Sequence, residues 1–230
     1  MQLRVPKPLN GWRQFAGEVG IIVVGVLIAL GAQQVVEDRY WRAQVADARA
    51  SLDSQLVESK FASLERIANA DCIARQLDFL DEVIAGTRPA EKLRIRIGSL
   101  RLWSTSTWDA AISSGSVAHM TPETRNAYAN LFSFTAALGD LNVKSYEAET
   151  NLRTLERHTD LTDVSRDRLA RDVANLRSMS AMLKLGAGQW LEGARPLKLV
   201  LEERSDAELK KAKICVMPDG SKVRMGVPVS

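Results

Sequence analysis

The sequence has few of the residues that metal-binding and catalytic sites need. Its 230 residues include two histidines, His119 and His158, and two cysteines. They form no His-x-x-x-His, Glu-x-x-His or Cys-x-x-Cys spacing. The sequence also lacks a glycine-rich phosphate loop and a Gly-x-Ser-x-Gly elbow. We therefore expect a protein that is not an enzyme and that holds no metal or other cofactor.

Turn-forming residues and excess charge are also scarce. Glycine occurs 14 times and proline 7 times, and the formal net charge is +3. A charge this small does not indicate nucleic acid as a partner. Leu, Ala, Arg and Glu dominate instead, a composition that favours helices. No compositional shift after residue 37 marks a second domain, so we expect an all-α chain.

One long apolar run stands out, within "GEVGIIVVGVLIALGAQQVVEDRYW" at residues 17–41. The 18 residues from Val19 to Val36 carry no charge. As a helix they span about 27 Å, close to the roughly 30 Å hydrocarbon core of a bilayer. Aromatic side chains suited to the membrane interfaces flank the run: Trp12, Phe15, Tyr40 and Trp41. We predict a transmembrane helix at residues 17–36.

The charges beside this run predict its orientation. Arg4, Lys7 and Arg13 precede it with no acid before Glu18, whereas residues 37–53 mix acids and bases. Because positive residues stay on the cytoplasmic side, residues 1–16 should be cytoplasmic and the bulk of the chain periplasmic. The protein would then cross the bacterial inner membrane once.

Two other interpretations of the run remain. A signal peptide cut after Ala29-Leu30-Gly31 would satisfy the cleavage rule, but the apolar run continues to Val36 and the helical pattern to Trp41. A buried core helix of a soluble protein is the second. Nothing downstream is apolar enough to surround such a helix on all sides.

The segment "GEVGIIVVGVLIALG" resembles the anchor of an uncharacterised family of small bacterial membrane proteins. The matching residues are Gly17-Glu18, Val23-Val24-Gly25 and Leu27-Ile28-Ala29-Leu30. "TSTWDAAISSG", at residues 105–115, is similar to a Thr-aromatic-acid…Ser-Gly segment of the same proteins. The resemblance implies a single-pass inner-membrane anchor with a helical extracytoplasmic domain, and it implies no activity.

One face of the predicted anchor carries an acid and small residues. Glu18, Gly25, Ala29 and Ala32 are spaced by seven, four and three residues and so share a helix side. Gly25 and Ala29 form a small-xxx-small pair, which allows close approach of another helix. We predict a helix–helix interface at these four residues. The plainer alternative is that Glu18 only reaches the cytoplasmic headgroups.

We expect the first helix to continue from the membrane to Ala85, because no Gly or Pro lies between Gly31 and Gly86. The domain at residues 37–214 should be an antiparallel periplasmic bundle of about four long helices, one of them broken. The next expected helix covers residues 90–102, with an extended alternative because "RIRIGSLRLW" alternates. A short helix should follow, capped by Ser106 or Thr107 and stopped at Gly115. Two long helices come next: Pro122 to about Arg157, capped by Thr121, and Val164 to Lys184, capped by Thr162 or Asp163. Gly186, Gly188 and Pro196 should interrupt the stretch up to Glu203, and a last turn is expected at Ser205–Lys213.

The tail at residues 215–230 contains a Pro-Asp-Gly turn between short apolar pieces. It either forms a small hairpin or lies free. Cys72 and Cys215 are expected to form a disulfide if the domain lies in an oxidising periplasm. The alternative is two buried free thiols. The aromatic residues Trp103, Trp108, Tyr128, Phe132 and Phe134 favour a core over a ligand pocket, with Trp108 and Ile112 plugging the end of the bundle.

Two functions remain. The first is a membrane-anchored interaction or accessory protein, whose partners would be the lipid bilayer and another membrane protein or itself. Contact would be made through the anchor face and the periplasmic bundle. The second is a sensory ectodomain that signals laterally, because about 16 residues inside are too few for a signalling module.

Overall fold

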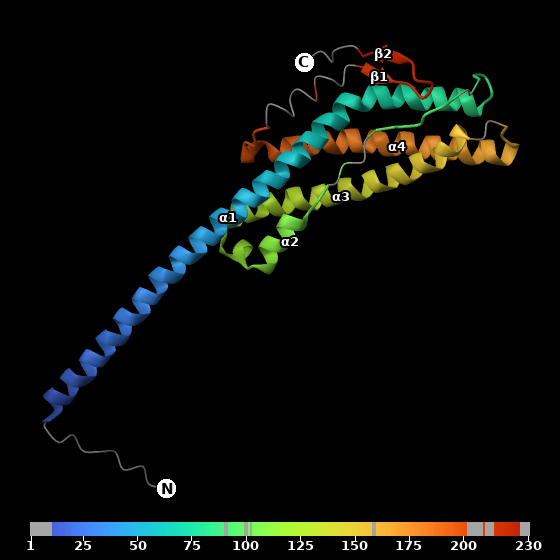
Figure 1. The fold of residues 1–230 in the computed structure, drawn as a ribbon. Coiled ribbons are helices and arrows are strands. Elements are labelled where there is room, and N and C mark those ends of the chain that lie inside the picture. The colour runs from blue at the N-terminus through green and yellow to red at the C-terminus, as the bar shows by residue number, and fades with distance from the viewer. Residues whose placement is uncertain are drawn as a thin grey trace, which may run out of the picture. The chain divides into compact units, whose positions relative to one another are not determined.

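The computed structural model describes residues 11–89, 92–98, 101, 103–157, 160–201, 209 and 214–225. Within them the chain is mostly helical (Figure 1). Its elements are the α-helices α1 (Gly11–Ile84), α2 (Ser106–Ser113), α3 (Pro122–Leu152) and α4 (Asp163–Ala194), the short 3-10 helices η1 (Ser116–His119), η2 (Arg153–Glu156) and η3 (Arg195–Leu197), and the strands β1 (Ile214–Val216) and β2 (Lys222–Arg224).

The chain forms two compact units, Met1–Asp47 and Ala48–Ser230. The described part of the first unit is the N-terminal half of α1, and every residue from Phe15 to Tyr40 is exposed. The second unit contains the rest of α1 and all the other elements. As predicted, α1 runs without interruption to Ile84, and the chain turns at Gly86, whose φ of +77° is in the left-handed region.

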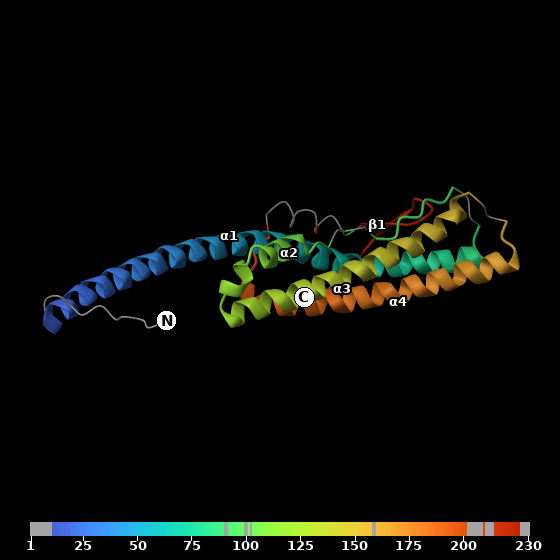
Figure 2. The same ribbon diagram turned by 90° about the horizontal axis from the view of Figure 1, so that it is seen from below.

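Within the second unit, α1 and α3 run in the same direction. Asp53 of α1 bonds Tyr128 of α3, and Arg66 bonds Asn142, so residue numbers rise together along the two helices. The ribbon in Figures 1 and 2 shows the same course. The prediction of a wholly antiparallel arrangement was therefore wrong for this pair.

Helix α4 runs against the other two. Arg177 near its middle pairs with Asp78 of α1, whereas the later Lys184 lies beside the earlier Asp71. Three long helices thus share a core, and the fourth helix, α2, has only eight residues. That core is aliphatic and lies where α1, α3 and α4 meet; it includes Leu77, Leu80, Leu152, Leu155, Val173 and Leu176.

An extended segment connects α1 to α2, and we call residues 92–98 the strap. Leu93, Ile95 and Ile97 are buried and the residues between them are exposed. This is the alternation of a strand, so the expected helix over residues 90–102 was wrong for the strap. The connection has to run back along α1 to reach α2. An extended chain covers about 3.3 Å per residue, whereas a helix covers about 1.5 Å, so an extended segment spans this distance with fewer residues.

The glycines late in α4 do not break the helix, contrary to expectation. A Cβ at Gly186 would lie 2.7 Å from Cδ2 of Leu138, so the missing side chain lets α3 approach closely. Beyond it, the buried indole of Trp190 donates to the hydroxyl of Thr135 at 2.9 Å. This packing offsets the roughly 0.5–1 kcal/mol that a glycine costs within a helix.

The helix starts follow their local signals. Thr121 accepts a hydrogen bond from the Thr124 N–H, and Thr162 accepts one from the Ser165 N–H, as predicted for two N-caps. Helix α2 is preceded by Thr105 rather than capped by Ser106 or Thr107, and it ends before the left-handed Gly115. The turn predicted at Ser205–Lys213 lies largely outside the described residues.

Candidate functional site

The predicted anchor face lies on the first unit's stretch of α1. Glu18, Gly25, Ala29 and Ala32 are all exposed. A Cβ added at Gly25 would meet nothing within 4 Å, so no contact in the described part of the chain requires a glycine there. Gly186 is the opposite case, because the fold itself leaves no room for a side chain. The structure places the four predicted residues on one helix without giving them any partner.

This helix is long and apolar enough to cross a membrane, and none of its most apolar 18-residue window is buried. Aromatic pairs lie on either side of the apolar run. Trp12 and Phe15 have ring centroids 6.0 Å apart, and Tyr40 and Trp41 are 5.3 Å apart. Large exposed side chains such as Ile21 and Ile28, 76% and 67% exposed, would be costly in water.

The predicted cysteine pair is bonded in the structure. Cys72 of α1 and Cys215 of β1 have Cα atoms 5.3 Å apart and are separated by 143 residues in the sequence. Cys215 is 1% exposed. The bond attaches the C-terminal hairpin of β1 and β2 to the middle of the second unit's α1, and of the two alternatives for the tail, the hairpin is the one observed.

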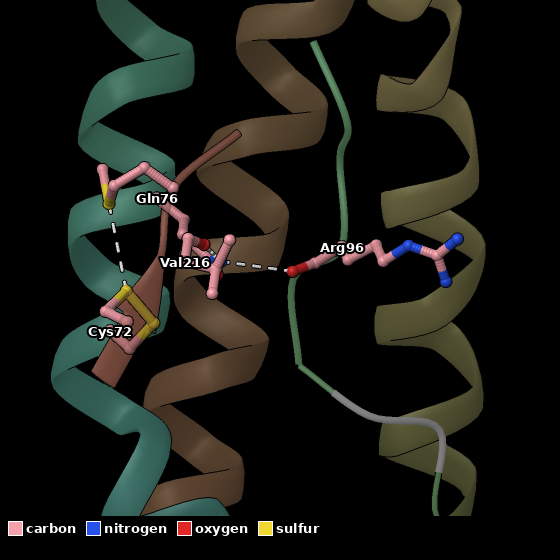
Figure 3. The surroundings of a disulfide bond; sticks show 6 residues. Cys72, Gln76, Arg96 and Val216 are labelled. Carbon is pink, nitrogen blue, oxygen red and sulfur yellow. Dashed lines mark hydrogen bonds between the residues drawn. A yellow bond between two sulfur atoms is a disulfide. The ribbon is translucent and has the colours of Figure 1, made fainter. Parts of the chain in front are cut away.

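Gln76, one helical turn after Cys72, joins three segments (Figure 3). Its side-chain Nε2 donates to the carbonyl of Arg96 in the strap at 3.2 Å and to that of Val216 in β1 at 2.7 Å. Its Oε1 is buried and has no hydrogen-bond partner in the described part of the chain. The strap and the hairpin are also bonded directly, because the Arg94 N–H donates to the Pro218 carbonyl at 2.7 Å. The disulfide, the hydrogen bond from the Gln76 side chain and the backbone bond from Arg94 together hold the hairpin in place.

A buried carboxylate of α3 also bonds the strap. Glu149 is 3% exposed. Its carboxylate accepts a hydrogen bond from Arg153 Nη2 at 2.7 Å and another from the backbone N–H of Ile97 in the strap. Burial raises the pKa of Glu149 above its ordinary value of 4.5, and the bonds from Arg153 and Ile97 only partly oppose that effect. Arg66, which donates to Asn142 Oδ1 at 2.5 Å, adds a half-buried charge nearby. Its pKa is lowered by burial.

The strap is therefore an extended segment whose backbone is satisfied mainly by side chains. The Ile95 N–H donates to Glu156 Oε1 at 2.6 Å, just as Ile97 donates to Glu149. The sequence analysis missed both acids, because an isolated glutamate in a charged helix usually faces solvent. The alternating "RIRI" was the available signal, since an extended segment without a sheet needs acceptors from elsewhere.

Of the five aromatic residues that the sequence favoured as core, Tyr128 and Phe132 are buried, whereas Trp103, Trp108 and Phe134 are half-buried. Tyr128 is fully buried, and its hydroxyl donates to Asp53 Oδ1 at 2.6 Å. Burial and this bond raise the pKa of Tyr128 to about 12. Trp108 stacks on Phe132 with centroids 5.6 Å apart. Ile112, expected to plug the core beside Trp108, is instead 53% exposed.

An open groove of about 820 Å³ lies between the second unit's α1 and the residues leading into α2. Gln55 spans it, accepting hydrogen bonds from the N–H and hydroxyl of Thr107. At its edge Arg101 makes a two-bond ion pair with Glu65, at 2.6 and 2.7 Å. The lining mixes small, polar, charged and apolar side chains: Ala50, Ser51, Ser54, Gln55, Glu58, Ser59, Phe61, Ala62, Arg101, Ser104 and Thr107.

The described residues contain no group of three or more His, Cys, Asp or Glu side chains that could hold a metal ion. His119 is exposed, and His158 lies outside the described residues. The chain matches no protein-family model, no curated protein and no solved structure. The features that bear on function are therefore the predicted anchor face, the disulfide and the surfaces of the second unit.

Proposed function

We propose that the protein is a membrane-anchored interaction or accessory protein without catalytic activity. In this proposal residues 17–36 of α1 cross the bacterial inner membrane once. Residues 1–16 lie in the cytoplasm, and a periplasmic helical bundle follows. The basic residues before Glu18 support this orientation. The disulfide between Cys72 and Cys215 supports an oxidising compartment for the second unit.

The observation that carries the proposal is the row of small residues on one side of the exposed apolar helix. A helix that serves only as a tether needs hydrophobicity and gains nothing from glycine. Here Gly25, Ala29 and Ala32 share one side of an exposed apolar helix, and a Cβ added at Gly25 would meet nothing within 4 Å. In a bilayer such a side allows another helix to pack closely. The partner is another membrane protein or a second copy of the chain.

Glu18 adds a polar group at the edge of the same side. A carboxylate near the membrane boundary is stabilised by a polar partner or by the headgroup region. In the proposed complex it bonds a donor on the partner helix. The second unit, held rigid by its core and by the disulfide, provides a further contact surface outside the membrane.

Copurification tests the proposal. A tagged full-length chain is expressed in its membrane and recovered in a mild detergent. We expect a stoichiometric protein partner or a second copy of the chain. The control is the same chain with residues 19–36 replaced by leucines, which inserts equally well but lacks the small residues. Recovery of the wild-type chain alone, or equal recovery of the partner by both chains, would contradict the proposal.

The second candidate is a sensory ectodomain, which the groove beside Gln55 favours. Its volume of about 820 Å³ is within the range of small-molecule sites. Against it, the groove is open, and Phe61 is the one aromatic side chain among the described residues that line it. The same purification separates the two candidates, because a sensor would be recovered without a protein partner and would be stabilised by a small ligand.

A further inference from the structure

The hairpin of the second unit has a second face and an edge that the disulfide does not use. Cys215 and Val223 are opposite each other and point inward, where Cys215 is bonded to α1. Their neighbours in the strands therefore point outward: Ile214, Val216, Lys222 and Arg224. Of these, Ile214 is 57% and Val216 51% exposed. In Figure 1, β1 lies next to α1 and β2 lies outside it.

The hydrogen-bond pattern shows which backbone groups are left open on β2. The Met217 N–H donates to the Ser221 carbonyl at 2.8 Å, so this is a hydrogen-bonded pair. Pairs alternate along an antiparallel ladder, so Val216 and Lys222 form a non-bonded pair. The Val216 carbonyl indeed points away from β2, to Gln76.

It follows that the N–H and C=O groups of Lys222 point away from β1, and those of Arg224 do the same. Among the described residues the sheet has two strands, and no backbone bond from another segment reaches this edge. We call Lys222–Arg224 with these outward groups the β2 edge. It offers the spacing of donors and acceptors that a third strand would use.

The charge around the β2 edge is positive. Lys222 and Arg224 are exposed, and neither makes an ion pair with a described residue. The strap, bonded to the hairpin turn through the Arg94 backbone, exposes two further cations, Lys92 and Arg94. The nearby acids already have partners, since Asp219 accepts from Ser221 and Glu156 from Ile95.

We propose that the β2 edge binds an extended acidic segment of a partner protein, which adds to the sheet as a third strand. The inference rests on the proposed function, for which it names a contact surface and the chemistry of the partner. In such a strand, carboxylates at alternate positions lie beside Lys222 and Arg224. The residues between them are apolar and lie on the side of half-buried Val223.

A peptide fits this surface better than other anions do. The outward backbone groups of β2 need a partner with a backbone of its own, which neither a lipid headgroup nor a polysaccharide offers. The outer face of the hairpin has no aromatic side chain on which nucleic-acid bases would stack.

The test uses the full chain in detergent micelles and a fluorescent decapeptide of alternating Glu and Val, with binding followed by anisotropy. A Lys–Val peptide is the charge control. A Glu–Val peptide with one central Val replaced by Pro is the backbone control, because proline cannot donate to a strand. We expect the Lys–Val peptide to bind about tenfold more weakly than the Glu–Val peptide, and the proline peptide about fivefold more weakly. A tenfold change in affinity corresponds to about 1.4 kcal/mol.

Lys222→Glu with Arg224→Glu should weaken binding about tenfold, by replacing attraction with repulsion. The matched control, Lys144→Glu with Arg171→Glu, changes net charge equally at exposed positions of α3 and α4 and should bind as the wild type does. Equal binding by the β2 variant, or equal binding of the proline peptide, would overturn the proposal. So would binding to vesicles of anionic lipid but not to the peptide. If copurification recovers a partner and the peptide fails, only this inference falls.

Discussion

Cys72 and Cys215 are bonded to each other across 143 residues of sequence, with Cα atoms 5.3 Å apart. This bond fixes the C-terminal hairpin against the middle of the second unit's α1. Gln76 bonds the same hairpin one helical turn later.

Replacing both cysteines should cost much of the stability of the second unit. Cys72→Ala with Cys215→Ala removes a closure of 143 residues. In the chain-entropy account a loop of this size stabilises by roughly 4–5 kcal/mol, and measured losses run about 2–5 kcal/mol. Denaturant unfolding measures the change, and hydrogen exchange should show residues 214–225 opening first. Two cysteines that alkylate freely in the folded wild-type protein would contradict the pairing.

Two glycines of α4 should respond oppositely to alanine. A Cβ at Gly188 meets nothing within 4 Å, so Gly188→Ala should stabilise by about 0.5–1 kcal/mol. At Gly186 the same methyl would lie 2.7 Å from Leu138, and overpacking costs about 1–3 kcal/mol. The difference between the two variants isolates this packing cost. Equal free energies of unfolding would show that α3 and α4 do not touch at Gly186.

The buried Glu149 predicts a pH dependence with a definite sign. Its pKa is raised on folding, so the folded state binds the proton more tightly than the unfolded state does. The free energy of unfolding should therefore gain a contribution as the pH falls from neutral toward the ordinary carboxyl value of 4.5. The carboxylate is surrounded by Arg153, Arg66 and Arg96. These positive charges reduce the contribution to the free energy of unfolding without reversing its sign.

Glu149→Gln should remove this part of the pH profile, whereas Glu147→Gln, at an exposed position of the same helix, should leave it intact. Urea unfolding at several pH values gives the comparison. If the Glu149→Gln profile matches that of the wild type, the carboxylate titrates as it would in water and the strap is not held as described.

Local signals predicted the elements whose stability is local. Thr121-Pro122 and Thr162 mark helix starts because the cap bond forms within one turn. The long uninterrupted α1 follows from the lack of Gly or Pro between Gly31 and Gly86. The exposed anchor residues could be placed on one face from spacing alone.

What the sequence did not predict depends on tertiary contacts. Gly186 breaks helices in general, but here Leu138 fills the space it leaves. The strap is extended because its buried isoleucines and the acceptors on α3 and η2 compensate for a missing sheet. Nothing in the local sequence indicates that the strap covers Glu149. The parallel course of α1 and α3 depends on this same strap.

Membrane orientation can be tested with fusions. Alkaline phosphatase fused after Ser230 should be active, because the enzyme works only outside the cytoplasm, and a fusion after Arg13 should be inactive. The basic residues before Glu18 give the reason. An inactive fusion at Ser230, or a mature chain that begins at Ala32, would contradict a single uncleaved anchor.

The most direct test of the central claim is crosslinking in membranes with Gly25→Leu. If α1 recognises a partner helix through its small face, a leucine at Gly25 separates two backbones that nearly touch while insertion is unaffected. Leu27→Ile, about 160° around the helix, is the matched control. The account predicts that Gly25→Leu loses most of the crosslinked complex and that Leu27→Ile retains it. Equal amounts of complex in the wild type and Gly25→Leu would show that the anchor is only a tether.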